Sequence, residues 1–221
     1  MKALVISPHL DDETLGCGGT LLRHKREGDA VAWLNVSGIS MELGFSAEKV
    51  NQQTVEIERV AQLYNFDAVH NLNLPPAQLD MLPSQQLVER LGEVIRLIRP
   101  DVIYLPFPGD IHTDHRIVFD AAIACTKWFR GNTIKRVLVY ETLSETDFGL
   151  SFSNGGFKPN VYVNITEFLE TKITIMRLYE KEMGIFPYPR SDQAIRALAQ
   201  VRGVVAGYAA AEGFILLREI I

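Results

Sequence analysis

Residues 7–13 constrain this chain most, because they place charged side chains directly after a strand-like run. Residues 3–6 are apolar and partly β-branched, and Pro8 soon follows them, which favours a buried strand over a helix. One imidazole and three carboxylates then come within five residues. Carboxylates so close together raise each other's pKa, and a divalent cation would relieve their repulsion. Residues 7–13 therefore predict a metal site at a strand end, with an acidic helix cap as the simpler alternative.

A second cluster, residues 112–115, holds two histidines and an aspartate and also follows a strand-like run, residues 102–105. With it, three of the five histidines of the chain come just after two expected strands. In open parallel α/β sheets, sites form beyond the carboxyl ends of the strands, where the strand order reverses. If the two strands are neighbours there, His9, Asp12 and His115 would form a three-ligand zinc site with an open position for water.

These motifs resemble those of the PIG-L/LmbE-type zinc-dependent de-N-acetylases. The first family motif, (P/A)-H-x-D-D-E, is matched by residues 8–13, and the second, H-x-D-H, by residues 112–115. The Arg-Gly at residues 202–203 and the Ala-Glu-Gly-Phe at residues 211–214 are similar to the family's ending. The resemblance covers nearly the whole chain, in the family's order. It implies removal of an N-acetyl group from an N-acetylglucosamine-type sugar conjugate, with release of acetate and a free amine.

The resemblance also implies a role for each polar side chain of the first motif. Zinc, or another divalent metal such as Fe²⁺, would be held by His9, Asp12 and His115. Asp11 is next to a ligand but free, so it would act as general base on the zinc-bound water and later protonate the leaving amine. Glu13 either supports the ligands or caps the following helix.

Two further side chains come from the second motif. His112, as an imidazolium, would stabilise the tetrahedral oxyanion, while Asp114 would hold its ring and raise its pKa. The family usually carries one more cation near the site, an Arg three residues before a Glu on the helix expected at residues 47–65. Here Gln53 stands at the position of that Arg. This departure leaves a substrate role for Gln53 open and favours a solvated helix face.

Three alternatives remain at this point. The first is a nucleotide-binding protein without metal. The glycines at 16, 18 and 19 would then form a phosphate-cradling turn, although they could equally serve close backbone packing. Their spacing matches neither of the phosphate-binding motifs G-x-G-x-x-G and G-x-x-x-x-G-K-[ST]. The second is a structural zinc site, which usually has four protein ligands and often thiolates, but no second Cys is near Cys17 in the sequence. The third is a metal-dependent amidase that acts on a non-sugar amide.

Strand-like runs alternate with helical periodicity along the chain, which predicts an α/β fold. We expect a Rossmann-like parallel sheet flanked by helices on both faces, parallel for at least its first five strands, with the site at the C-terminal ends of the strands. The expected strands are residues 3–6, 30–36, 68–74, 102–105, 135–141, 160–165 and 211–221. The expected helices are residues 14–27, 47–65, 84–99, 116–129, 166–183 and 193–205.

All 221 residues are expected to form a single catalytic domain, to which about residues 144–221 contribute substrate-side loops and C-terminal elements. Residues 144–158 are polar and glycine-rich, and predict either a lid or a mobile surface loop. The aromatic side chains of this loop are Phe148, Phe152 and Phe157. Together with residues 186–189, they suggest a pocket wall, with Tyr188 and Arg190 exposed on a turn.

Composition excludes several classes of partner. The net charge of −5 argues against a surface that binds nucleic acid. No apolar run approaches the roughly 18 residues of a membrane helix, and the N-terminal apolar run is too brief for a signal peptide. Two cysteines provide no disulfide framework. We therefore expect a cytoplasmic enzyme whose partner is a small N-acetylated sugar, with a homo-oligomer left open.

Overall fold

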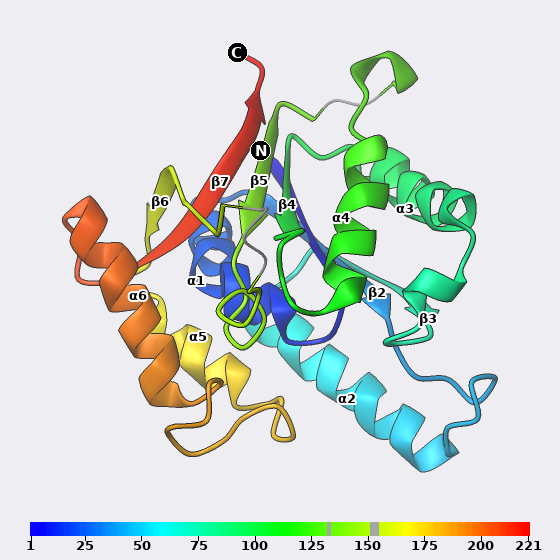
Figure 1. The fold of residues 1–221 in the computed structure, drawn as a ribbon, viewed down its shortest axis with the longest axis horizontal. Coiled ribbons are helices and arrows are strands. Elements are labelled where there is room, and N and C mark those ends of the chain that lie inside the picture. Colours follow the sequence, from blue (N-terminus) through cyan, green and yellow to red (C-terminus); the bar gives the residue numbers. More distant parts are fainter. Residues whose placement is uncertain (132–133, 151–154) are drawn as a thin grey trace.

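A seven-stranded sheet forms the centre of the computed structural model, which describes residues 1–131, 134–150 and 155–221. The strand order across the sheet is β3-β2-β1-β4-β5-β7-β6 (Figure 1). The strands are β1 (Lys2–Ser7), β2 (Ala30–Ser37), β3 (Ala68–Leu74), β4 (Val102–Pro106), β5 (Arg136–Tyr140), β6 (Val161–Asn164) and β7 (Ala211–Glu219).

The first five strands are parallel, as predicted. β7 runs in the opposite direction, because it pairs antiparallel with both β5 and β6, so the sheet is mixed. The strand order reverses between β1 and β4, which lie side by side with Val5 opposite Tyr104. The loops that leave these two strands therefore meet at the point where parallel α/β sheets form their sites.

Helices cover both faces of the sheet, because successive side chains of a strand point to opposite faces. In β1, Ala3 and Val5 enter one core while Leu4 and Ile6 enter the other. The first core is covered by α1 (Asp12–Arg26), α2 (Ala47–Tyr64), α5 (Leu169–Met176) and α6 (Asp192–Ala206). The second is covered by α3 (Ser84–Ile98) and α4 (Thr113–Ala124). None of the helices in the described residues is long and apolar enough to cross a membrane.

Two helices differ from their expected bounds by more than two residues at each end. The helix expected at residues 116–129 is α4, which begins three residues earlier and ends at Ala124. It begins earlier because the His112 ring caps it, accepting a hydrogen bond from the backbone N–H of Asp114. The helix expected at residues 166–183 is the shorter α5, since the Thr166 hydroxyl is bonded to the Asn164 side chain and does not cap the helix.

The C-terminal motif fastens β7 to α1. The buried carboxylate of Glu212 accepts hydrogen bonds from the backbone N–H groups of Gly19 (2.8 Å) and Thr20 (2.7 Å) and pairs with Lys172 at 2.7 Å. The glycines of α1 allow this close packing: a Cβ at Gly16 would lie 2.2 Å from the Tyr140 ring. The glycines thus serve close backbone packing, one of the two expected uses, and the phosphate-cradling turn is not needed to explain them.

Candidate active site

The turn after β1 holds Asp11 and Asp12 in different environments. Asp11 has a φ of +97°, a backbone conformation that few residues other than glycine adopt, and its N–H donates to Glu13 Oε2 at 3.2 Å. Asp12, the first residue of α1, accepts the N–H of His9 at 2.8 Å. Within the described residues, no side chain caps α1 at its N-cap position. The simple alternative of an acidic helix cap therefore does not describe this turn.

Three side chains from the two motifs converge beside this turn. The Oδ2 atom of Asp12 lies 3.5 Å from His9 Nδ1 and 3.3 Å from His115 Nε2. The potential ligand atoms of the three residues all lie within 4.8 Å of one another. His115 Nε2 is buried and has no hydrogen-bond partner among the described residues. Such an orphaned nitrogen, aimed at a carboxylate and a second imidazole, is what a divalent-ion site requires.

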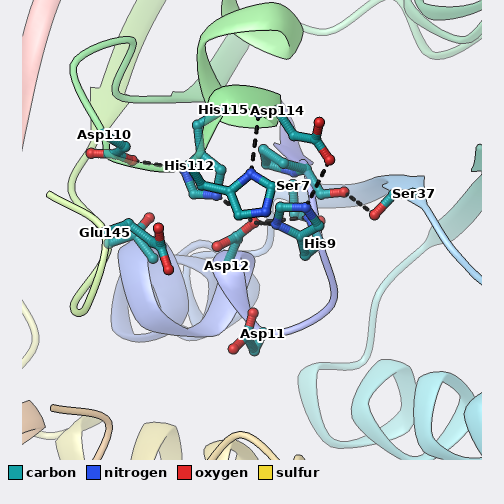
Figure 2. A network of polar contacts seen from close by, with 12 residues as sticks. Ser7, His9, Asp11, Asp12, Ser37, Asp110, His112, Asp114, His115 and Glu145 are labelled. Atoms are coloured by element: carbon teal, nitrogen blue, oxygen red, sulfur yellow. Dashed lines mark hydrogen bonds and ion pairs between the residues drawn. The ribbon is translucent and has the colours of Figure 1, made fainter. Parts of the chain in front are cut away.

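His115 and His9 each contact a further carboxylate through a second ring nitrogen (Figure 2). Asp110 Oδ2 lies 2.7 Å from His115 Nδ1, and Asp114 Oδ2 lies 3.1 Å from His9 Nε2. Carboxylates in this position fix the tautomer and orientation of metal-binding histidines. The sequence interpretation missed Asp110, although its place two residues before the second motif was a usable signal.

The expected pairing of the Asp114 carboxylate with the His112 ring is wrong. That carboxylate accepts hydrogen bonds from the backbone N–H groups of Ala77 (2.8 Å) and Leu79 (3.3 Å) and contacts His9 instead. The backbone N–H of Asp114, and not its carboxylate, bonds His112 at Nδ1. Burial, and then the positive charge of His9, lower the pKa of His112; the charge of Asp114 raises it, as expected, but does not outweigh them, so the net shift is opposite to the expected direction.

Charge in the cluster is distributed unevenly. Burial disfavours the ionised Asp12, but the neighbouring His115 and His9 outweigh it and hold the pKa of Asp12 below its usual range. Burial also disfavours a charged His115, yet Asp12 and Asp110 raise the pKa of that ring to about 10. Burial and the charge of Asp12 raise the pKa of Asp11. Two adjacent aspartates thus have their pKa values moved in opposite directions, which is frequent at catalytic sites.

Asp11 is paired with a residue that was expected to be exposed. Arg190 Nη1 lies 2.7 Å from Asp11 Oδ2, and the arginine side chain is only 19% exposed. In Figure 2 the Asp11 carboxylate lies beside the cluster of His9, Asp12 and His115 and is not part of it. The structure therefore gives the two aspartates different neighbours, with Asp12 among the imidazoles and Asp11 next to them.

A cavity of about 470 Å³ opens over these residues. Polar side chains of α2 form one wall, and the segment after α5 contributes Lys181, Glu182 and Arg190 to another. Apolar contacts come from Leu10, Ile39, Phe45, Pro76 and Ala77. The cavity is large enough for a small polar ligand with an apolar face, such as a sugar unit.

Gln53 is part of the α2 wall and does not lie on a solvated face. Its Oε1 accepts the N–H of Ile39 at 3.0 Å, so the side chain fixes the backbone of the facing wall. The neighbouring wall residues on α2 follow a helical spacing, with one side chain about every turn. They are Lys49, Gln52 and Glu56.

Of the aromatic residues expected to wall the pocket, those that the structure describes lie elsewhere. Phe148 is exposed, and Phe157 packs edge-on against Phe107 with ring centroids 5.3 Å apart. Phe152 lies outside the described residues. From the loop expected at residues 144–158, Glu145 lines the cavity; none of residues 186–189 does. Polar side chains, not aromatic ones, therefore dominate this side of the cavity.

Together, the fold and the site define an α/β protein with a candidate divalent-metal site at the switch point of its sheet. The model of the family PIG-L, GlcNAc-PI de-N-acetylase, matches residues 4–126, which is more than half of the chain. The chain belongs to the PIG-L family. The matched residues include both motifs.

Comparison with individual proteins agrees with this membership. The diacetylchitobiose deacetylase of Thermococcus kodakarensis is 25% identical over 225 residues, which cover 96% of this chain and 81% of that protein. The crystal structure of the conserved protein TT1542 from Thermus thermophilus has a TM-score of 0.80 at 25% identity, and covers 99% of this chain and 96% of that one. GalB, a 4-carboxy-2-hydroxymuconate hydratase from Pseudomonas putida, has a TM-score of 0.75 at 17% identity, and covers 100% and 97%. Because the fold also carries a hydratase, the reaction has to be argued from the site.

Proposed function

We propose that this chain is a metal-dependent hydrolase that removes the N-acetyl group of an N-acetylglucosamine-type sugar conjugate and releases acetate and a free amine. The observation that carries the proposal is the arrangement of His9, Asp12 and His115, two of them held by further carboxylates, with Asp11 at their side. Membership of a de-N-acetylase family supports the same reaction.

The donor set fits a catalytic metal. His9, Asp12 and His115 would hold the ion, and three protein ligands leave a position open, whereas a structural zinc site is closed by four. Two imidazoles and one carboxylate suit zinc and also Fe²⁺. A bound ion of this kind would lower the pKa of water and polarise the amide carbonyl. Both cysteines are buried, and neither belongs to the groups of described residues that could hold a metal ion, which argues against a thiolate site.

The chain's own residues supply the proton transfers. Asp11 takes a proton from the attacking water and returns it to the nitrogen of the leaving amine. His112 donates a hydrogen bond from Nε2 to the carbonyl oxygen as that oxygen gains negative charge, because its Nδ1 is already occupied by the N–H of Asp114. Asp114 and Asp110 orient the two histidines and take no part in proton transfer.

A sugar substrate is supported by the cavity and by a relative. The cavity combines hydrogen-bonding side chains, such as Gln52 and Glu56, with the apolar surface of Phe45 and Pro76. Sugars present both hydroxyl groups and an apolar ring face, so such a mixed wall suits them. The Thermococcus relative is a diacetylchitobiose deacetylase, which makes N,N′-diacetylchitobiose the first compound to test.

Released acetate and new primary amine should be measured together, with zinc-loaded protein, on N-acetylglucosamine, N,N′-diacetylchitobiose and a simple non-sugar acetamide. We expect equal amounts of both products from a sugar and little from the acetamide. Turnover of the acetamide alone would favour the amidase alternative. No acetate from any sugar or amide, together with hydration of an unsaturated acid, would place the chain with the hydratase.

A further inference from the structure

Arg190 joins the candidate base to two other segments of the chain. Its Nη1 lies 2.7 Å from Asp11 Oδ2 and 2.6 Å from Glu182 Oε2, and its Nε donates to Ser144 Oγ at 2.9 Å. These partners follow β1, α5 and β5, respectively. One side chain therefore ties the turn that carries Asp11 and Asp12 to the loops that follow β5 and α5.

Two of these contacts are to side chains of residues whose backbone conformations are costly to maintain. Asp11 has a φ of +97° and Ser144 a φ of +74°, the two largest values among the non-glycine residues that the structure describes. Such positions are costly and persist only where the surroundings hold them. Glu13 holds the Asp11 backbone, and its carboxylate is in turn fixed by the Tyr179 hydroxyl at 2.7 Å. Arg190 holds the side chain.

The contact leaves one oxygen of the base available. Arg190 bonds Asp11 at Oδ2, and within the described part of the chain no hydrogen bond uses Oδ1. Asp11 lines the cavity, as does Arg190. The guanidinium group of Arg190 is planar and rigid, so its contact with Oδ2 restricts the orientation of the Asp11 carboxylate and therefore the direction in which Oδ1 points.

We propose that Arg190 is a positioning residue, which fixes the Asp11 carboxylate so that its free oxygen faces the reacting water. This role rests on the proposed function, in which Asp11 is the base. Lysine could replace the charge of Arg190 but not its simultaneous contacts through Nε and Nη1, so the shape of the side chain matters as well as its charge.

The inference is tested with zinc-loaded protein and four variants: Arg190→Met, Arg190→Lys, Asp11→Asn and the double variant Arg190→Met/Asp11→Asn. Arg177→Met is the matched control, because Arg177 is an exposed arginine that pairs with Asp192 and does not line the cavity. We expect Arg190→Met to keep its metal and to lose roughly 10- to 100-fold in kcat with little change in KM, and Arg190→Lys to recover part of the loss.

The double variant separates positioning from other roles. If Arg190 acts through Asp11, adding Arg190→Met to Asp11→Asn should change the residual rate by no more than about twofold. Multiplied losses would show that Arg190 acts independently of Asp11, and a defect confined to KM would show that it binds substrate. Either result overturns the inference and leaves the proposed function standing.

Crystal structures give a readout that does not need activity. In Arg190→Met the Asp11 carboxylate should turn while His9, Asp12 and His115 keep their places. An Asp11 side chain that stays in place would overturn the inference even if no substrate were found. Inactivity of the zinc-loaded wild type on every N-acetyl compound would instead count against the proposed function.

Discussion

Asp11 and Asp12 are neighbours in the sequence, but the structure gives them different partners. Asp12 lies between two imidazoles, and Asp11 pairs with Arg190. A sequence motif can predict that one of the two is a ligand, because a turn presents them in different directions. It cannot identify Arg190, which is 179 residues away from Asp11.

Asp11→Asn is expected to lower turnover on the order of 10²–10⁴-fold while the protein keeps its metal, because the change removes a base and no ligand. Asp12→Asn is the matched control and should lose metal. The measurement is acetate release together with elemental analysis. Loss of metal from Asp11→Asn, with metal retained in Asp12→Asn, would mean that the two roles are reversed.

Asp114→Asn is expected to weaken metal affinity by about 10- to 100-fold, because the carboxylate that orients His9 is lost. Asp120→Asn on the same helix is the control, because the Asp120 side chain is 65% exposed, whereas that of Asp114 is buried. Competition with a chelator of known affinity provides the measurement. Equal affinities in Asp114→Asn and the wild type would show that Asp114 does not support the site.

His112→Ala is expected to lower kcat by roughly 10²–10³-fold and to change KM little, because charge on the carbonyl oxygen develops only near the transition state. His70→Ala on the edge strand β3 serves as control. Steady-state kinetics on a sugar substrate distinguish the two parameters. If the defect were confined to KM, His112 would bind substrate and have no oxyanion role.

Most strands could be predicted from the sequence, because short apolar and β-branched runs bounded by Gly, Pro or Asp identify them. Residues 68–74 match β3 at both ends. The antiparallel placement of β7 was not predictable from local pattern, since it depends on where the chain returns after α6. Helix ends were also harder: α5 stops at Met176, although its apolar pattern continues.

The α2 helix shows why core positions are hard to assign from periodicity. Val60 and Tyr64 are buried, but Val55, on the same helix, is 37% exposed. The first half of the helix lines the cavity. The pattern of apolar residues therefore predicts the helix but not which part of it is buried.

The glycines of α1 lead to a prediction about packing. Gly16→Ala is expected to lower the free energy of unfolding by about 1–3 kcal/mol, because the new Cβ would overlap the buried Tyr140 ring. Gly92→Ala in α3 is the control: its nearest neighbour is the flexible end of Arg96, at 3.1 Å. There the better helix propensity of alanine should offset any strain. Urea denaturation measures both, and equal effects would contradict close packing at Gly16.

The chain as a whole brings its two motifs together through topology. β1 and β4 are far apart in the sequence but adjacent in the sheet, so their carboxyl ends place His9 and His115 beside one another. Two motifs at strand ends were enough to predict this meeting. The last third of the chain then adds Arg190, which the motifs could not reveal, and the Glu212 of the C-terminal motif, which anchors β7 on α1.

Metal reconstitution tests most directly whether this site performs the proposed reaction. Protein stripped with a chelator should release no acetate from N,N′-diacetylchitobiose or another N-acetyl sugar, and zinc or Fe²⁺ should restore release until about one ion is bound per chain. The His115→Ala variant should bind no ion at this stoichiometry and stay inactive. Equal acetate release by the stripped and the metal-loaded protein, or by wild type and His115→Ala, would contradict a catalytic metal held by His9, Asp12 and His115.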